Sequence, residues 1–358
     1  MSEIFIIAEI GVNHNGSRDI AMEMIDTASK AGVDAVKFQT FNTEKLVSKN
    51  TPKTEYQIKN DRSSKNQFDM LKKLELSRDL HLELNEYCSS KEIEFMSTAF
   101  DEDSLDFLVH EVGMKKNKIP SGELNNAPFL IKHGATGNKI ILSTGMSSLK
   151  QIHQAISAIA FGFSKTNMKP SIKSFREVIK SKDIQNELRK KITLLHCTSQ
   201  YPAPIDSLNL MALFTLKEEF EMPVGYSDHS LGTEASIAAS AMGAEIIEKH
   251  FTLDNTLEGP DHKASLEPNQ LINLVSSIRK VELMLGSRSK SPSKEELENK
   301  NLATKSIVAK SIIRQGEYFT DDNLTTKRPG DGMSPFLFWD LIGVKSKKEY
   351  MPDEQIDQ

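Results

Sequence analysis

The chain has 358 residues, with 45 Lys or Arg against 50 Asp or Glu and a formal net charge of -5. This balance provides no strong basic field for a nucleic-acid backbone, and no apolar run approaches the roughly 20 residues that span a bilayer. The two cysteines exclude a disulfide scaffold and indicate a reducing compartment. The first residues contain neither a basic region nor a long apolar one, so we expect no signal peptide and a soluble cytoplasmic protein.

Short β-rich runs alternate with longer stretches of helical character, such as residues 20–31, 79–91 and 233–241. Strands alternating with helices along most of a chain are typical of a (β/α)8 TIM barrel. A doubly wound open sheet is the alternative, but no GxGxxG motif follows the first run. The predicted strands are residues 5–11, 35–40, 94–100, 117–121, 139–146, 192–199, 223–229 and 245–253.

Two polar stretches interrupt this alternation. Residues 45–72 are rich in Lys, Asn and Ser and follow the second predicted strand. We therefore expect a long loop at the end of the barrel where the chemistry occurs. Residues 164–191 are polar and basic, with a helical middle, and precede the sixth predicted strand. That order places them at the opposite end of the barrel, and we assign them no function.

The composition changes again at residues 287–300, which read as a linker. The expected domains are thus a catalytic barrel at 1–286 and a small β-rich module at 301–358. Within the module, residues 306–309 and 311–313 resemble strands. So small a module is expected to lean on a partner surface.

Polar residues occur late in nearly every predicted strand. Residues two apart share a face of a strand, and barrel active sites lie where the strands end. Burying a charge costs several kcal/mol unless the charge is paired or used. The pattern therefore predicts a catalytic or binding cavity. The polar residues in or just after the strands are Glu9, Lys37, Gln39, Thr98, Lys118, Ser121, Glu123, Ser199, Tyr201, Ser227, His229, Glu248 and His250.

Two of these residues, His229 and His250, end adjacent predicted strands. Neutral imidazole binds divalent metals, so the pair suits Mn²⁺, Mg²⁺, Co²⁺ or Zn²⁺ acting as a Lewis acid. The alternative is two hydrogen-bonded histidines that cap their strands. His14 and His262 are further candidate ligands, although both are expected in loops.

The lysines of the pattern suggest an anion site. Lys37 and Lys118 can hold a phosphate as point charges, with hydroxyls adding donors. The alternative is an internal ion pair with Glu9 or Glu123. Three carboxylates are candidates for acid–base work or for binding sugar hydroxyls, namely Glu9, Glu123 and Asp261. The hydroxyls that accompany the lysines are those of Thr98, Ser121 and Ser227.

Nine segments together resemble the sialic acid synthases, a family that includes N-acetylneuraminate, legionaminate and pseudaminate synthases. No single segment is specific, but the set covers nearly the whole chain. The segments are AEIGVNHNG (8–16), VKFQT (36–40), PSGE (120–123), ILSTGM (141–146), HCTSQYPAP (196–204), GYSDHSLG (225–232), EKHFTLD (248–254), GPDHKASLEP (259–268) and KRPGDGMSP (327–335).

The resemblance implies a (β/α)8 barrel followed by a small antifreeze-like (SAF) domain. It also implies a reaction, in which phosphoenolpyruvate condenses with the open-chain aldehyde of an N-acylated mannosamine-type sugar. The product is a nine-carbon 2-keto sugar acid, with release of phosphate. The segment GPDHKASLEP looks more like the N-acetylneuraminate and legionaminate branch than the pseudaminate branch. The acceptor, N-acetylmannosamine or 2,4-diacetamido-2,4,6-trideoxymannose, stays open.

The resemblance also implies roles for particular residues. His229 and His250 would hold the metal, with Mn²⁺ favoured over Mg²⁺ or Co²⁺, and Glu9 and Glu123 would join them as catalytic residues. Arg328 would enter the active site of a partner subunit, which implies a domain-swapped homodimer. The residues that match phosphoenolpyruvate-binding positions are Lys37, Thr98, Lys118, Ser121, Ser199 (Asn in some members) and Ser227. Those that match sugar-binding positions are Gln39, Glu123, Tyr201, Asp261 and Arg328.

Two other interpretations remain. One is another phosphoenolpyruvate-dependent 3-deoxy sugar acid synthase or metal-dependent barrel aldolase, which would not need Arg328. The other is a non-catalytic carbohydrate- or ice-binding protein built around the C-terminal module. The charges of Lys327 and Arg328 argue against a flat ice-binding face.

Overall fold

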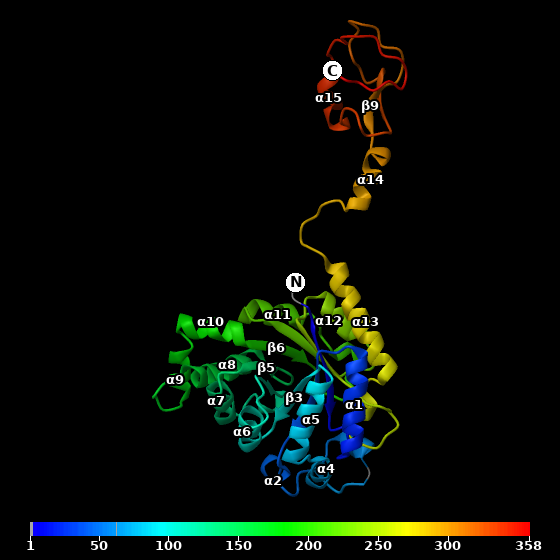
Figure 1. The fold of residues 1–358 in the computed structure, drawn as a ribbon. Helices are drawn as coiled ribbons and strands as arrows, with labels where there is room; N and C mark the ends of the chain where they lie inside the picture. Colours follow the sequence, from blue (N-terminus) through cyan, green and yellow to red (C-terminus); the bar gives the residue numbers. More distant parts are fainter. Residues whose placement is uncertain (1–2, 62) are drawn as a thin grey trace. The chain divides into compact units, whose positions relative to one another are not determined.

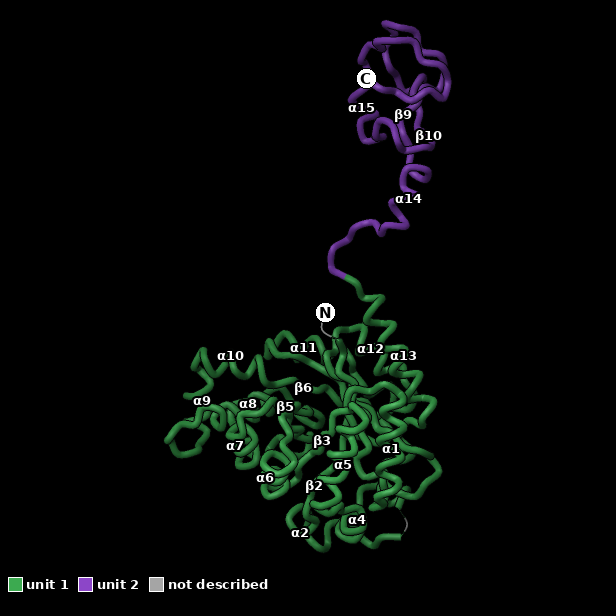
Figure 2. The backbone as a smooth tube through the Cα atoms, in the orientation of Figure 1, with its two compact units in different colours: residues 1–286 green, residues 287–358 purple. Residues whose placement is uncertain are grey.

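The computed structural model describes residues 3–61 and 63–358. The chain divides into two compact units, Met1–Gly286 and Ser287–Gln358, which Figure 2 shows in different colours. Each unit has its own apolar core, so each is described by itself.

The first unit is a closed barrel of parallel strands in chain order (Figure 1), which confirms the predicted (β/α)8 barrel. The first two strands have the predicted bounds, whereas the carboxyl ends of the others come earlier than predicted. The last residues predicted for these strands follow the strands in the chain, in the loops at the carboxyl end of the barrel. The strands are β1 (Phe5–Gly11), β2 (Ala35–Thr40), β3 (Glu94–Ala99), β4 (Lys116–Ile119), β5 (Lys139–Ser143), β6 (Ile192–Cys197), β7 (Val224–Asp228) and β8 (Ile246–His250).

Helices cover the outside of the barrel, as α1 (Arg18–Ala31) illustrates. Ser17 caps its first turn by accepting from the backbone N–H of Ile20, and Gly32 ends it with a φ of 80°, in the left-handed region that suits glycine. Its buried face packs into the main apolar core. The other covering helices are α5 (Arg78–Ser90), α6 (Glu102–His110), α7 (Ala127–Ala135), α8 (Leu149–Ser164), α11 (Ala212–Phe220), α12 (Glu234–Ala241) and α13 (Pro268–Leu285).

The inside of the barrel has an apolar layer and a charged layer. Alternate residues of a strand face inward, so the two layers lie two residues apart along each strand. The charged layer is nearer the carboxyl ends and includes Glu9, Lys37, Lys118 and Glu248, which are all buried. The apolar layer contains Ile7, Ala35, Met96, Ile141, Leu195 and Ile246, with Phe5 packed against it.

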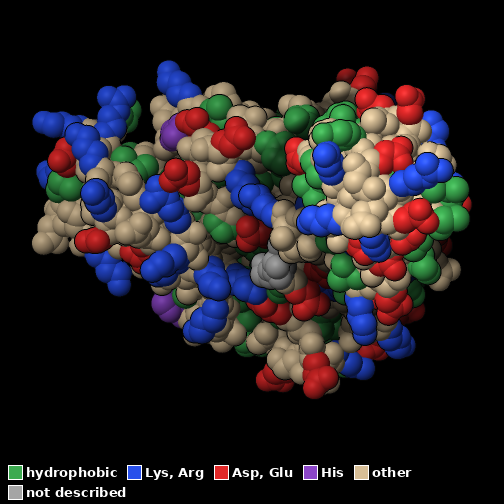
Figure 3. Space-filling model, turned by 90° about the horizontal axis from the view of Figure 1, so that it is seen from above, with side chains coloured by type: hydrophobic (Ala, Val, Ile, Leu, Met, Phe, Trp, Pro, Cys, Tyr) green, Lys and Arg blue, Asp and Glu red, His purple; other side chains and the backbone are tan. Residues whose placement is uncertain are grey.

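The two polar insertions are more ordered than predicted. The expectation of a long loop at residues 45–72 is wrong, because the chain there forms α2 (Thr43–Leu46), α3 (Glu55–Asn60) and α4 (Gln67–Leu74). Asn66 caps α4, whose Met70 and Leu74 are buried. The second insertion forms α9 (Ile172–Val178) and α10 (Lys182–Lys191). Figure 3 shows many Lys and Arg side chains at its left edge, where these helices lie.

The second unit contains α14 (Lys294–Ala303), the antiparallel pair β9 (Ser306–Ala309) and β10 (Leu324–Lys327), and α15 (Phe338–Leu341). The second half of the predicted linker, residues 287–300, is helical, because a capping box between Ser293 and Glu296 starts α14 there, and α14 has no buried residue. The strand predicted at 306–309 is confirmed. Residues 311–313 form no strand, and Ile313 makes an isolated bridge with Tyr350.

Short 3₁₀ turns complete both units, namely η1 (Ser121–Glu123), η2 (Ile205–Ser207), η3 (His262–Ala264) and η4 (Pro335–Leu337). Within residues 3–61 and 63–358, no helix is both long and apolar enough to cross a membrane.

Candidate active site

A cavity of about 410 Å³ lies at the carboxyl ends of the strands, directly above the charged layer. Most of the predicted site residues line it, although they come from all parts of the barrel sequence. Parallel strands bring their carboxyl ends to one rim, and this rim is where barrel enzymes place their chemistry. The predicted residues that line the cavity are Glu9, Lys37, Gln39, Thr98, Lys118, Ser121, Ser199, Tyr201, Ser227, His229, His250 and Asp261.

The floor of the cavity is a network of buried ion pairs. Lys37 Nζ lies 2.5 Å from Glu9 Oε2 and 3.6 Å from Glu248 Oε2. Lys118 Nζ lies 2.7 and 2.9 Å from the two carboxylate oxygens of Glu248. Ser227 donates to Glu248 Oε1 over 2.9 Å. The pairing of Lys37 with Glu9 was one expected alternative, whereas the partner of Lys118 is Glu248 rather than Glu123.

These contacts set the charges on the floor. Burial raises the pKa of Glu248, but Lys118 and Lys37 outweigh it, so the net pKa lies well below its ordinary value and the group is a carboxylate. Burial raises the pKa of Glu9, which the charge of Lys37 only partly opposes. The pKa of Lys37 is raised, because Glu248 and Glu9 outweigh its burial, whereas burial lowers the pKa of Lys118. The floor is thus balanced internally and holds two cations that an incoming anion can contact.

The two histidines lie beside this floor with their rings 5.5 Å apart. His229 Nδ1–H donates to the backbone carbonyl of Thr198 over 2.7 Å, which leaves Nε2 with its lone pair. The Nδ1 of His250 is buried without a hydrogen-bond partner among the described residues. Burial lowers the pKa of His229 to about 4, and burial together with the charge of His229 lowers the pKa of His250 well below its ordinary value.

Neutral imidazoles with a free lone pair are what a divalent metal requires, so the donor set fits one. Among the described residues, however, no group of three or more His, Cys, Asp or Glu side chains is arranged to hold an ion. A metal at His229 and His250 would therefore take its remaining ligands from water or substrate.

Tyr201 packs against both histidines, and Tyr56 and Asp261 line the cavity near it. The ring of Tyr201 lies 4.2 Å from that of His229 and 5.3 Å from that of Tyr56 on α3. Burial, followed by the charge of Asp261, raises the pKa of both tyrosines, so they stay protonated. Burial and then the negative charge of Glu9 raise the pKa of Asp261 to about 7. A carboxyl group with that pKa can exchange a proton near neutral pH.

The loop after β5 closes one side of the cavity at Gly145. Its backbone N–H donates to Ser121 Oγ over 3.0 Å, and Ser121 Oγ lies 3.2 Å from Cys197 Sγ. A Cβ on Gly145 would lie 2.4 Å from Ser199 Oγ, 2.8 Å from Cys197 Sγ and 2.9 Å from Ser121 Oγ. Only glycine fits, because the three side chains of the neighbouring strand ends converge on this position.

Not every predicted residue reaches the cavity. Glu123 is outside its lining and accepts from Asn126 Nδ2 over 2.7 Å, because β4 ends at Ile119 and the chain then turns into η1. His14 Nδ1 accepts from the backbone N–H of Gly16, and His262 bonds to Thr252, so neither of these expected extra ligands lines the cavity. Arg328 is an exposed residue of the second unit.

Two parts of the site received no role from the sequence pattern. One is Glu248, which joins both lysines of the floor. Its position two residues before His250, on the same face of β8, was a usable signal. The other is the wall formed by residues 46–71, where Leu46, Tyr56 and Leu71 line the cavity. Its place after the second strand predicted a segment at this end of the barrel, but its polar composition predicted a loop and indicated no site residue within it.

Cations, carboxylates and neutral histidines converge where the strands of the barrel end. This arrangement is typical of (β/α)8-barrel enzymes. Residues 24–290 match the model of the NeuB family. The chain is 43% identical over 356 residues to the N,N'-diacetyllegionaminic acid synthase of Campylobacter jejuni, covering 99% of each chain. It is 44% identical over 341 residues to the synthase of the same name from Legionella pneumophila, covering 95% of this chain and 90% of the relative.

A solved structure agrees. The N-acetylneuraminic acid (sialic acid) synthetase of Leptospira borgpetersenii, in complex with citrate, superposes with a TM-score of 0.67 and 35% identity, covering 83% of this chain and 90% of that one. The chain belongs to the NeuB family, which confirms the resemblance to the sialic acid synthases.

Proposed function

We propose that this protein condenses phosphoenolpyruvate with the open-chain aldehyde of an N-acylated mannosamine-type sugar. C3 of phosphoenolpyruvate forms a bond to the aldehyde carbon, whose oxygen takes a proton and becomes a hydroxyl. Water adds at C2, and the bond between C2 and the ester oxygen of the phosphate breaks, so inorganic phosphate leaves. The hydroxyl left on C2 gives up its proton, and C2 becomes a ketone. The 43% identity to an N,N'-diacetyllegionaminic acid synthase over nearly the whole chain supports this function and, for the acceptor, 2,4-diacetamido-2,4,6-trideoxymannose.

The observation that carries the proposal is the balanced floor of two lysines and two glutamates beneath two neutral histidines. Lys37 and Lys118 are the groups that phosphoenolpyruvate, an anion with both carboxylate and phosphate, would contact. Thr98 accepts from Lys37 Nζ over 3.2 Å and so holds the ammonium in place. Both lysines are already paired with Glu9 and Glu248. An incoming anion would therefore bind ammonium groups that also contact these carboxylates.

The carboxyl groups with raised pKa values are the ones suited to exchange protons during the reaction. Asp261, with its pKa at about 7, lines the cavity on the side of Tyr201, and the pKa of Glu9 is also raised. We assign Asp261 to the sugar side and Glu9 to the reacting centre. Gln39, which donates to Glu9 Oε1 over 3.3 Å, orients that carboxylate.

We propose a divalent metal, Mn²⁺ first and Mg²⁺ or Co²⁺ as alternatives, at His229 and His250. When bound, such an ion supplies Lewis acidity toward a carbonyl oxygen. The hydrogen bond from His229 Nδ1–H to the carbonyl of Thr198 fixes the tautomer that leaves Nε2 as the ligand atom.

The second unit is proposed to be an antifreeze-like domain that serves a partner subunit. Arg328 is exposed on it, and a guanidinium suits the hydroxyls and carboxylate of the reactants. We propose a homodimer in which Arg328 of one chain completes the cavity of the other. Mixing inactive Arg328→Ala and His229→Ala chains tests this, because a mixed dimer regains one complete site only when the arginine acts on the partner's barrel. Activity of about a quarter of the wild-type value is then expected, and none if the arginine acts within its own chain.

The central test is phosphate release from phosphoenolpyruvate with Mn²⁺ and each of the two candidate sugars. We expect the larger kcat/KM with 2,4-diacetamido-2,4,6-trideoxymannose than with N-acetylmannosamine. EDTA and the His229→Ala variant should abolish release. Absence of metal-dependent release with every N-acylated mannosamine-type sugar would contradict the proposed function.

A further inference from the structure

One flank of the cavity is apolar, in contrast to its charged floor. The side chains that form this apolar flank follow β1, β2 and β3 in the chain, and none of them carries a charge. The members of the apolar flank are Val12, Leu46, Val47, Met70, Leu71 and Phe100.

Packing contacts fix most side chains of the apolar flank in place. Val12 and Met70 are buried in one cluster with Phe41 and Leu74, and Leu46, Leu71 and Phe100 pack against that cluster. Behind the flank, the rings of Phe41 and Phe100 meet edge to face at 6.2 Å.

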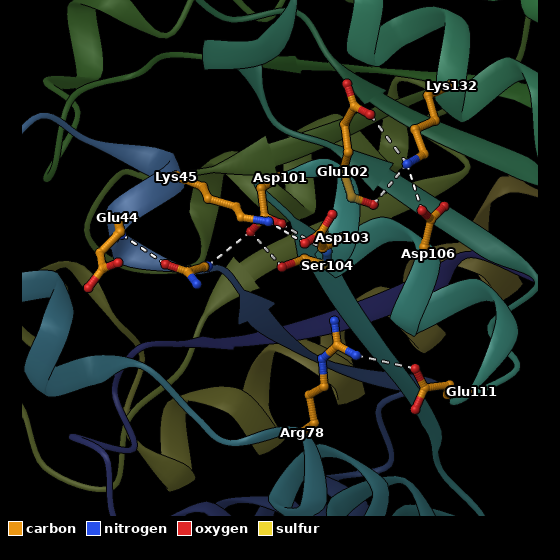
Figure 4. Close-up of polar contacts among 11 residues, drawn as sticks. Glu44, Lys45, Arg78, Asp101, Glu102, Asp103, Ser104, Asp106, Glu111 and Lys132 are labelled. Atoms are coloured by element: carbon orange, nitrogen blue, oxygen red, sulfur yellow. Dashed lines mark hydrogen bonds and ion pairs between the residues drawn. The ribbon is translucent and has the colours of Figure 1, made fainter.

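Polar contacts hold this wall against the barrel. Asp101 accepts from the backbone N–H of Asn42 over 2.9 Å and from Ser104 Oγ over 2.6 Å, which joins the start of α2 to the start of α6. Figure 4 shows these contacts together with the ion pair between Lys45 and Asp103. At the other end of the wall, Glu75 accepts from Thr43 Oγ1 over 2.8 Å, so the segment is closed on itself. The flank is therefore in place before a substrate arrives.

The strand order decides which part of a sugar reaches the flank. In a closed barrel of eight strands, β3 lies opposite β7, and β4 lies opposite β8. His229 follows β7 and His250 ends β8, and β8 pairs with β1. Val12, which follows β1, is therefore on the histidine side, whereas the members of the flank that follow β2 and β3 lie farther round the rim, with β3 opposite β7. A sugar whose aldehyde lies at the histidines would therefore meet the part of the flank that follows β2 and β3 with its far end, carbons 4 to 6.

The chemistry of the wall limits what that end can carry. The residues of the wall that line the cavity beside the flank are neutral polar or aromatic, namely Thr54, Tyr56, Gln57 and Gln67. An acetamido group combines an amide with a methyl group, and a deoxy carbon is a methyl group, so both match a wall of this kind. Two hydroxyls in the same place would lose water against apolar side chains.

We propose that the apolar flank is the specificity determinant that favours an acceptor with a 4-acetamido and a 6-deoxy group over one with hydroxyls at both positions. This inference rests on the proposed function and names the acceptor class for the same cavity. The flank acts on the sugar only and leaves phosphoenolpyruvate to the floor.

The test compares kcat/KM for the two sugars in wild-type protein, Leu71→Asn and Val47→Thr. Val47→Thr is nearly isosteric, so it keeps the comparison valid where the larger change impairs folding. We expect the preference for the diacetamido sugar to fall by about tenfold in each variant, with the KM for phosphoenolpyruvate unchanged. Leu74→Ala is the matched control, because Leu74 belongs to the same cluster but does not line the cavity. It should lower stability and leave the sugar preference as it was.

An unchanged sugar preference in both flank variants overturns the inference, and so does a wild-type preference for N-acetylmannosamine. In both cases phosphate release still occurs, so the condensation stands. A preference for N-acetylmannosamine changes only the acceptor named for it. Absence of release with both sugars in the wild-type protein removes the proposed function itself, and the inference with it.

Discussion

Lys118 on β4 and Glu248 on β8 form a two-point ion pair across the barrel, with Nζ 2.7 and 2.9 Å from the two carboxylate oxygens. The two strands are opposite each other in the closed sheet, and 130 positions separate the residues in the chain. Both side chains are almost completely buried. The pair therefore ties opposite walls of the barrel together just beneath the cavity.

Removing the charge of Glu248 should destabilise the protein and make it depend on an anionic ligand. Glu248→Gln leaves Lys118 without its buried counter-ion, which costs on the order of 3 kcal/mol. Phosphoenolpyruvate brings negative charge to the same floor, so it should recover part of that loss. Thermal unfolding with and without the ligand measures both effects.

The exposed pair of Arg18 and Glu83 provides the control for this measurement. Glu83→Gln should change stability far less than Glu248→Gln does, because water screens an exposed pair. Equal losses in the two variants would show that the Lys118–Glu248 contact has no special weight.

Replacing either histidine should remove metal binding in the absence of substrates. His229→Ala and His250→Ala each take one of only two imidazole ligands, so the affinity for Mn²⁺ should fall by at least about 100-fold. Titration calorimetry, or the electron paramagnetic resonance signal of free Mn²⁺, reports this without any turnover. His153 is exposed and pairs with Glu219, so His153→Ala should bind Mn²⁺ as the wild type does. Wild-type affinity in both active-site variants would rule out the metal site.

The raised pKa of Asp261 predicts that the free energy of unfolding falls as the pH rises. Its pKa is raised to about 7 by burial and then by the charge of Glu9, with Tyr56 and Tyr201 also facing it. The folded state thus binds more protons than the unfolded state between the ordinary pKa of an aspartate and about 7, so the free energy of unfolding falls through that range. Asp261→Asn removes this effect and should be more stable than the wild type by about 4 kcal/mol near about pH 8, and nearly equally stable near about pH 4.

Denaturant unfolding of the metal-free proteins at several pH values measures that difference. Asp254 is the control, because it lies in the same loop but is exposed, and hydrogen bonds from Thr256 lower its pKa. Asp254→Asn should have an effect of the opposite sign. A pH-independent difference between wild type and Asp261→Asn would contradict the raised pKa.

A methyl group at Gly145 should weaken phosphoenolpyruvate binding. Its Cβ would lie within 3 Å of Ser121, Cys197 and Ser199, so these side chains must move out of the cavity wall. Displacing binding groups by about 1 Å typically costs tenfold or more, and we expect the KM for phosphoenolpyruvate to rise by at least about tenfold in Gly145→Ala. Steady-state kinetics with saturating sugar measures it. Gly122 lines the cavity, but nothing lies within 4 Å of a Cβ there, so Gly122→Ala should leave this KM unchanged. Equal KM values in the two variants would sink the packing explanation.

Much of the barrel and its cavity was readable from residue order. The alternation of strands and helices predicted the closed barrel, and the two-residue period placed Lys37 and Gln39 on one inward face. The same period placed His250 at the rim beside His229, since neighbouring strands end together. These features depend on local chain geometry, and local geometry follows from sequence.

Other features of the site depend on the residue at which each strand or helix ends. Glu123 was expected in the cavity as a strand-end carboxylate, yet β4 stops at Ile119 and the turn directs Glu123 toward Asn126. Residues 45–72 were expected to form a loop, yet they fold into the wall that carries the apolar flank. Met70 anchors this wall in an apolar cluster, and some of its polar side chains, such as Gln57, Asp61 and Ser64, are buried as well.

The sequence by itself determined which side chains come to the rim, because side-chain direction along a strand repeats every two residues. Only the tertiary structure decided which of them touch. Lys118 meets Glu248 rather than Glu123 because closure of the barrel brings opposite strands within reach of two long side chains. A contact of that kind depends on the diameter of the closed sheet and on burial, and neither is encoded in the spacing of residues along one strand.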